Sequence, residues 1–209
     1  MNLTDADKAY NRIKEKIVTV EMSPGSVIRE NQLMQELGLG RTPIREALKQ
    51  LQTENLVIVA PRRGMFVADI TITDLQQIYE VRVELEPLCA RLAAERVTPE
   101  QLATMRNLVA ECQRVDRYDT ELFLTLDRHF HHLVAQSTGN KFLLNEFEMF
   151  YNLSLRIWYL ALNHIQPEDV DVDAHVEILS AVEAREGGQA DQMMRQHIQH
   201  FHDAIKLHL

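Results

Sequence analysis

Over the first 70 residues, the order of apolar and polar positions predicts a helix, a short strand, two more helices and a two-stranded ribbon. The first helix is expected to end at Ser23-Pro24-Gly25, because proline and glycine favour a turn. The second is expected to span about Glu30 to Leu37, with Gly38 ending it. The apolar face of the first helix consists of residues spaced three or four apart, namely Ala9, Ile13, Ile17 and Val20.

The third helix and the ribbon complete this region. The helix is expected to begin at Thr42-Pro43, because threonine is a favoured N-cap and proline suits the first helical position. Two β-rich runs follow at Leu56–Val59 and Met65–Val67, joined by the turn at residues 60–64. Two helices joined by the short turn Gly38–Arg41 have the layout of a helix-turn-helix, and the ribbon makes it a winged one.

Beyond about Thr73 the pattern predicts helices alone. One of them is expected to begin at the cap Thr98-Pro99-Glu100 and to end near Val115, and a later break is expected at Gln166-Pro167. A helix before this cap is expected to end near residue 94, and the remaining helices are expected over residues 120–137, 141–163, 168–186 and 189–208.

The expected fold class is therefore mainly α, with two domains. A winged helix-turn-helix occupies residues 1–70, an all-helical antiparallel bundle occupies residues 73–209, and a linker near Asp69–Thr73 divides them. The first helix of the bundle is expected to bury the apolar stripe Ile78, Val81, Leu85, Leu88 and Leu92.

Composition agrees with a folded globular chain, because 45% of the 209 residues are hydrophobic and 25% are charged. No apolar stretch is long enough to span a membrane, and the first residues do not resemble a secretory signal. Cys89 and Cys112 lack the spacing of metal ligands, so they are expected to be reduced thiols in a cytoplasmic protein.

The net charge of −9 is distributed unevenly along the chain. Residues 1–70 contain ten Lys and Arg against nine Asp and Glu, for a net charge of +1, and the remainder has a net charge of −10. All nine histidines lie at or after His129. This asymmetry predicts two regions with different tasks.

Basic residues gather where a helix-turn-helix meets DNA. The N-terminal end of the third helix faces base edges in the major groove, where arginine can pair with guanine through two hydrogen bonds. Two arginines at the tip of the ribbon suit phosphates or the minor groove. The alternative is a helical hairpin with a solvated loop, but the combined features favour a double-stranded DNA operator. The expected DNA-binding residues are Arg41, Thr42, Arg45, Lys49, Arg62, Arg63 and Gly64.

The run from Leu37 to Leu51, LGLGRTPIREALKQL, resembles the GntR family of transcription regulators, as do Glu54–Val57 and Pro61–Val67. The resemblance implies that the third helix and the wing face DNA, and that a homodimer binds a pseudo-palindromic operator. Many members have serine where this chain has Gly40, so one phosphate contact is expected to be absent.

Four polar residues lie within apolar stripes of three predicted helices. Asp127 and His131 are four residues apart and share a face with apolar neighbours, while His175 and His197 each lie in a later stripe. One carboxylate and three imidazoles suit a divalent transition metal ion such as Zn, Ni or Mn. A single buried histidine is more often a hydrogen-bonded core residue, and His200 is an alternative to His197.

The other histidines near these stripes, His129, His132 and His202, are expected at the surface. Asp127–Leu133, Ser137–Asn140 and the segment Ile78–Glu86 resemble the FadR subfamily and its C-terminal FCD ligand-binding domain. In metal-binding members the ligands match Asp127, His131, His175 and His197, whereas many members have glutamate at the position of Ala174.

An arginine is expected to bind an effector beside this site. Arg82 lies beside an apolar stripe and could turn inward to bind a carboxylate through two hydrogen bonds; in the subfamily the matching arginine often faces the effector pocket. Arg156 is a second effector-binding prediction, with a structural ion pair as its alternative.

These features predict a transcription regulator, and by family habit a repressor, that a small carboxylate effector controls through the metal site. A regulator that senses the metal alone is one alternative, and a purely structural metal is another. A metal-dependent hydrolase is the least favoured, because the chain has no HExxH or GxSxG motif. No enzymatic activity is therefore expected.

Overall fold

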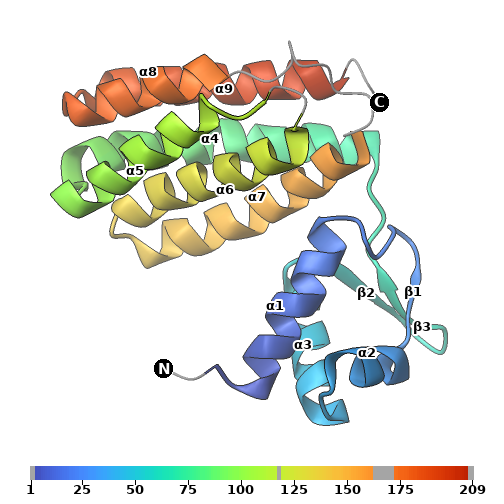
Figure 1. Cartoon of the computed structure of the whole chain (residues 1–209). Helices are drawn as coiled ribbons and strands as arrows, with labels where there is room; N and C mark the ends of the chain where they lie inside the picture. The colour runs from blue at the N-terminus through green and yellow to red at the C-terminus, as the bar shows by residue number, and fades with distance from the viewer. Residues whose placement is uncertain (1–2, 117–118, 162–171, 207–209) are drawn as a thin grey trace. The chain divides into compact units, whose positions relative to one another are not determined.

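The computed structural model describes residues 3–116, 119–161 and 172–206 (Figure 1). The chain forms two compact units. The first comprises Met1–Asp74 together with Asn152–Leu160, and the second comprises Leu75–Tyr151 together with Ala161–Leu209. In the described part of the chain, no helix is both long and apolar enough to cross a membrane.

The first unit is a three-helix winged helix-turn-helix. Its sheet has the order β1-β3-β2, and both pairings are antiparallel. The predicted ribbon is therefore confirmed, and the short strand before it adds a third member. In chain order the elements are α1 (Asp5–Val18), β1 (Val27–Ile28), α2 (Glu30–Leu37), α3 (Arg41–Thr53), β2 (Val57–Ala60) and β3 (Gly64–Val67).

Local signals determine where helices of this unit begin and end. The hydroxyl of Thr4 accepts a hydrogen bond from the Asp7 backbone N–H and the Asp7 carboxylate accepts one from that of Thr4, so α1 begins with a capping box. Gly38 ends α2 with φ of 66°, a left-handed conformation that glycine adopts without strain. The α1 and α3 helices pack together around a core that includes Ala9, Ile13, Ile17, Ile44, Leu48 and Leu51.

The expected start of α3 at a Thr42 cap is wrong. Gly40 is the N-cap, in extended conformation and without a side-chain cap, and the helix begins at Arg41. Thr42 is therefore the second residue of the helix and not its N-cap. As a result, no side chain caps the backbone N–H groups at this end of α3.

The second unit is helical throughout its described part. A capping box between Thr98 and Gln101 starts α5, as predicted. The predicted break at Gln166-Pro167, and the adjoining ends of the helices expected over 141–163 and 168–186, lie outside the described residues. The helices are α4 (Ile72–Arg96), α5 (Pro99–Cys112), α6 (Thr120–Ser137), α7 (Lys141–Ala161), α8 (Val172–Glu183) and α9 (Gly187–Lys206), although residues 72–74 of α4 and 152–160 of α7 belong to the first unit.

The buried face of α4 differs from the predicted apolar stripe. Val81 is exposed, and the leucines of the stripe are only half-buried. Arg82 and Glu86 are buried instead, at 3% and 2% exposure. Apolar periodicity misplaced this face because two charged residues that pair with each other lie in the core.

Candidate metal centre and nucleic-acid interface

The four predicted metal ligands converge in the second unit. Asp127 and His131 lie one turn apart on α6, His175 lies on α8 and His197 on α9. Each offers one ligand atom, and these atoms all lie within 4.8 Å of one another. All four residues are buried, with exposures of 7% or less.

Three distances within this Asp-His cluster (Asp127, His131, His175 and His197) are close to those between ligands of one ion. Asp127 Oδ1 lies 2.9 Å from His175 Nε2 and 3.5 Å from His131 Nε2. His131 Nε2 lies 3.1 Å from His197 Nε2. Four atoms bound about 2.1 Å from one metal ion would lie about 3.0–3.4 Å apart. The cluster therefore matches the size of a small divalent cation site.

Several ring nitrogens of the cluster lack hydrogen-bond partners. Among the described residues, neither nitrogen of His175 nor Nδ1 of His197 has one, although all three atoms are buried. The His175 Nε2 contact with Asp127 is short, but its direction is not that of a hydrogen bond. A buried nitrogen without a partner is costly, and a metal ion would satisfy the Nε2 atom.

A second layer of polar residues orients the cluster. Glu86 Oε2 lies 2.7 Å from His131 Nδ1, and Glu86 Oε1 accepts a hydrogen bond from Arg82 Nε at 2.5 Å. The hydroxyl of Tyr151 donates to Asp127 Oδ2. A carboxylate behind a ligating histidine fixes its ring orientation and raises its basicity, so Glu86 supports His131.

Burial and mutual charge shift the pKa values of these groups. Burial alone would raise the pKa of Asp127, but the adjacent imidazole rings, above all that of His131, hold it well below its usual value. Burial opposes protonation of His131 too, yet Asp127 and Glu86 raise its pKa to about 9. Burial and the neighbouring histidines lower the pKa of His197, so this ring is neutral and available as a ligand.

Arg82 points inward, one of the two orientations considered from the sequence. Its side chain is buried, pairs with Glu86, and lies between the rings of Tyr151 and Phe201, at 5.2 Å and 4.8 Å from their centroids. Its guanidinium therefore belongs to the layer around the cluster. Contact with an effector remains a prediction.

Arg156 belongs to the first unit, although it lies on α7. Its Nη2 donates a hydrogen bond of 2.6 Å to the backbone oxygen of Ala68. Burial lowers its pKa to about 10, against the opposing charges of Asp74 and Asp69. This environment resembles the structural alternative more than an effector contact, and its role in effector binding stays a prediction.

The burial of the remaining histidines differs in part from the expectation. His129 and His200 are exposed, so His197 rather than His200 joins the cluster. His132 is half-buried and pairs with Glu148. His202 is buried at 6% exposure and stacks on Tyr79 with ring centroids 4.1 Å apart, so its assignment to the surface is wrong.

The predicted DNA-binding residues lie on the first unit's surface. Arg41, Thr42, Arg45 and Lys49 are exposed along α3. Arg41 Nη2 donates to Asn31 Oδ1 at 3.1 Å, and Arg45 Nε lies 3.0 Å from both carboxylate oxygens of Glu30. Each of these arginines is therefore already in contact with the first turn of α2.

The tip of the wing exposes two guanidinium groups. Arg62 and Arg63 are exposed, and Arg62 has φ of 64° at the turn between β2 and β3. Gly64 follows with φ of 108°, a conformation that only glycine adopts readily. Arg63 lies over the ring of Phe66, 5.9 Å from its centroid. The turn thus keeps two positive charges at the end of the ribbon.

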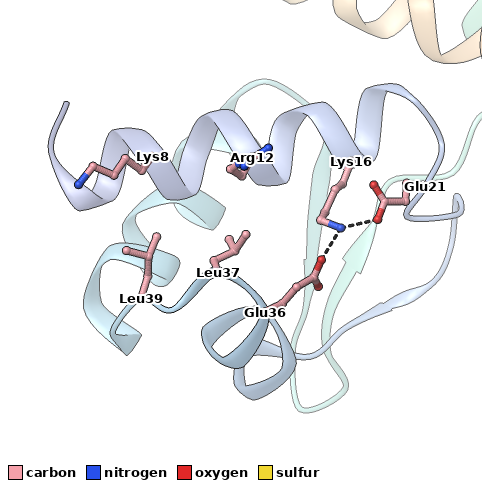
Figure 2. A pocket seen from close by; sticks show the side chains of 7 residues that line it. All are labelled: Lys8, Arg12, Lys16, Glu21, Glu36, Leu37 and Leu39. Carbon is pink, nitrogen blue, oxygen red and sulfur yellow. Dashed lines mark hydrogen bonds and ion pairs between the residues drawn. The ribbon is translucent and has the colours of Figure 1, made fainter. Parts of the chain in front are cut away.

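A groove of about 470 Å³ lies on the same unit. Figure 2 shows Lys16 of α1 between Glu21 and Glu36, with which it forms ion pairs, while Lys8 points away along the helix. The two carboxylates raise the pKa of Lys16 and compensate its charge. Lys16 therefore adds little net attraction for an anion in this groove. Its lining residues are Lys8, Arg12, Lys16, Glu21, Glu36, Leu37 and Leu39.

Sequence patterns did not identify the second layer. Glu86 and Tyr151 were not predicted as site residues, although Arg82 and Glu86 are spaced as an i, i+4 ion pair. That spacing is frequent on solvent-exposed helix faces, so it gives no warning of a buried pair. Tyr151 comes from α7, and no local pattern relates it to Asp127.

Two family descriptions match the two parts of the chain. Residues 5–67 match bacterial regulatory proteins of the gntR family, and residues 77–200 match the FCD domain. The second match alone covers more than half of the chain.

Similar proteins are named as transcription regulators. The HTH-type transcriptional repressor RspR of Escherichia coli K12 is 26% identical over 198 residues, covering 94% of this chain and 87% of RspR. An HTH-type transcriptional regulator in an unstable DNA locus of Streptomyces ambofaciens is 31% identical over 206 residues, covering 97% and 86%. The solved structure of E. coli McbR/YncC has a TM-score of 0.88 at 22% identity and covers 99% of both chains, which shows the fold.

Proposed function

Because this chain belongs to the GntR family of bacterial regulators and carries an FCD domain, we propose that it is a homodimeric, metal-dependent repressor controlled by a small carboxylate. The family and the similar proteins are DNA-binding transcription regulators and not enzymes. Repression is proposed because the similar protein RspR is named a repressor. The cytoplasm is the proposed location.

The exposed end of α3 supports DNA binding at the major groove. Arg41 and Arg45 have donors for guanine or phosphate, and no side chain caps the first turn of α3. Uncapped N–H groups and the helix dipole attract a phosphate, so the Gly40 start suits this end for a backbone contact. Arg62 and Arg63 would reach phosphates or the minor groove beside it.

The single observation that supports the metal is the buried convergence of Asp127, His131, His175 and His197. Two ring nitrogens of His175 lack partners, and Glu86 already supports His131 from behind. When bound, a Zn, Ni or Mn ion would supply a positive charge that attracts a carboxylate. Asp127 and the three histidines would bind it, leaving positions for effector oxygens.

We assign the effector to the carboxylate class on the charge of this region. Arg82 is buried beside the cluster and pairs with Glu86. An effector carboxylate close to the cluster would be attracted by the Arg82 guanidinium, a group that can bind a carboxylate through two hydrogen bonds. To regulate, the effector must bind one dimer geometry better than another, because equal affinity shifts no equilibrium.

Metal content tests the site directly. Protein purified without chelator is compared by elemental analysis with His175→Ala, and with His200→Ala as a matched control at an exposed histidine. We expect about one equivalent of metal in the wild type and in the control, and a loss in His175→Ala. Equal metal content in all three proteins contradicts the proposal.

Duplex DNA selected from a random library then tests regulation. We expect a panel of small mono- and dicarboxylates to include one that weakens binding to the selected duplex in metal-loaded protein, but not in His175→Ala. If Zn²⁺, Ni²⁺ or Mn²⁺ alone changes the affinity and no carboxylate does, the protein senses metal. If chelation changes stability alone, the metal is structural.

A further inference from the structure

The first turn of α2 contacts both arginines expected to meet base edges. Glu30 accepts from Arg45 Nε with both carboxylate oxygens at 3.0 Å, across 15 positions of the chain. The neighbouring Asn31 accepts from Arg41 Nη2 at 3.1 Å. The tertiary contact between α2 and α3 thus aligns one acceptor with each arginine.

The Glu30–Arg45 pair contributes little to folding stability. The Arg45 side chain is 59% exposed, and water and side-chain entropy weaken an ion pair that is this exposed. Glu30 is better shielded, with a side-chain exposure of 19%. A half-buried carboxylate therefore fixes one end of a solvent-exposed guanidinium.

The same carboxylate is unfavourable for DNA binding in general. Glu30 places a negative charge beside a surface that would approach phosphates, so it lowers non-specific affinity. A guanidinium has five donors, and the contact with Glu30 uses Nε. The contact holds the remaining donors in a defined direction. An arginine without such a contact would have to lose rotamer freedom when it binds DNA. Such an arrangement lowers the affinity for DNA in general and increases the discrimination between base sequences.

We propose that Glu30 is a positioning residue that sets base specificity by orienting Arg45. The proposal rests on the proposed DNA interface and identifies which residue controls its selectivity. Glu30 makes no contact with a base itself in this role. Asn31 acts in the same way on Arg41, through a neutral and weaker hydrogen bond.

The test compares base preferences of full-length variants. A library of duplexes with a randomised core is selected with the wild type, Arg45→Ala, Glu30→Gln and the double variant. Arg45→Ala should lower discrimination at its base pair by about 10-fold or more. Glu30→Gln should lower discrimination at that same base pair several-fold, and the double variant should be no worse than Arg45→Ala.

Two further variants separate positioning from charge. Glu30→Asp keeps the charge but shortens the reach, so we expect it to lose discrimination as Glu30→Gln does. Glu36→Gln removes one negative charge from the same helix, where it pairs with Lys16, and should leave every base preference unchanged. Non-specific binding of a random duplex should tighten in both Gln variants, because phosphate repulsion falls.

The outcomes distinguish this inference from the proposed function. If the wild type selects no preferred sequence, the DNA-binding proposal fails. If Arg45→Ala loses one base preference while Glu30→Gln and Glu30→Asp keep it, only the positioning role fails. The positioning role also fails if Glu30→Gln lowers discrimination at base pairs that Arg45→Ala leaves unaffected. Thermal melting of each variant shows that it is folded.

Discussion

At the scale of single residues, the cluster in the second unit depends on compensation between buried charges. Asp127, Glu86 and Arg82 are all buried, and each contacts an opposite charge or a hydrogen-bond donor. Removing one member of such a network leaves another without its partner, which costs more than the pair itself contributes. Glu86 is the most informative residue to change, because it contacts both Arg82 and His131.

Glu86→Gln should weaken metal binding about 10- to 100-fold while retaining the four ligands. The amide cannot supply the negative charge that orients and polarises His131 through Nδ1. Competition with a chromophoric chelator measures the affinity. Glu84→Gln is the matched control, since Glu84 is exposed and pairs with Arg195, and it should bind metal as the wild type does. Unchanged affinity in Glu86→Gln would remove Glu86 from the site.

The two cysteines should be unreactive in the folded protein. Cys89 and Cys112 are free thiols, each about 1% exposed, and burial raises the pKa of both to about 12. The thiolate is the reactive form, so at pH 8 only about 1 in 10,000 of each is ionised. Labelling by a disulfide reagent should become fast only in urea. Because the folded pKa is raised, stability should fall as the pH rises above about 9. Rapid labelling at pH 8 without urea would contradict this.

At the scale of helices, ends were predictable where the signal is local. The predicted span Glu30–Leu37 is confirmed for α2, and residues 120–137 are confirmed for α6. Both have an end that depends on nearest neighbours: Gly38 closes α2, and the Asp119 side chain caps α6 through the Leu122 N–H. The predicted start of α3 was wrong because threonine caps a helix only where its own backbone is extended. In this structure Gly40 is the extended residue, and Thr42 is already helical.

Glycine substitutions should have opposite effects at two helix ends. Gly38→Ala forces alanine into φ of 66° and should destabilise the first unit by about 1 kcal/mol, because a left-handed conformation strains Cβ. Nothing lies within 4 Å of the added Cβ, so the cost is backbone strain alone. Urea denaturation followed by circular dichroism measures it.

Gly188→Ala is the matched substitution. This glycine lies in the first turn of α9 without a positive φ, and its added Cβ also has nothing within 4 Å. Alanine should stabilise the second unit by about 0.5 kcal/mol through lower entropy of the unfolded chain. Equal effects of the two substitutions would argue against the left-handed turn at Gly38.

At the scale of the whole molecule, the two units have separate cores and contain different predicted sites. The predicted DNA-binding residues all belong to the first unit, and the Asp-His cluster belongs to the second. The cluster joins α6, α8 and α9, whereas the core of the first unit is formed mainly by α1, α3 and the sheet. Metal binding should therefore stabilise the second unit more than the first.

Hydrogen exchange should show this division. Adding Zn²⁺ to chelator-treated protein should increase backbone protection in α6, α8 and α9, because a ligand that binds only the folded state stabilises it. Protection in the α1 and α3 core should remain nearly unchanged. His175→Ala supplies the control and should show no response. Equal gains in both units, or a response in the variant, would contradict this division.

The sequence by itself determined the fold class, several helix ends, the basic residues of α3 and the wing and, with its resemblance to the FadR subfamily, the Asp-His cluster. Apolar periodicity and caps depend on near neighbours, and Asp127, His131, His175 and His197 each lie in phase with an apolar stripe. Only the tertiary structure placed Glu86 behind His131, buried Arg82 in α4 and joined Glu30 to Arg45. The partner of a charge depends on which helices pack together, and no spacing within one helix specifies that.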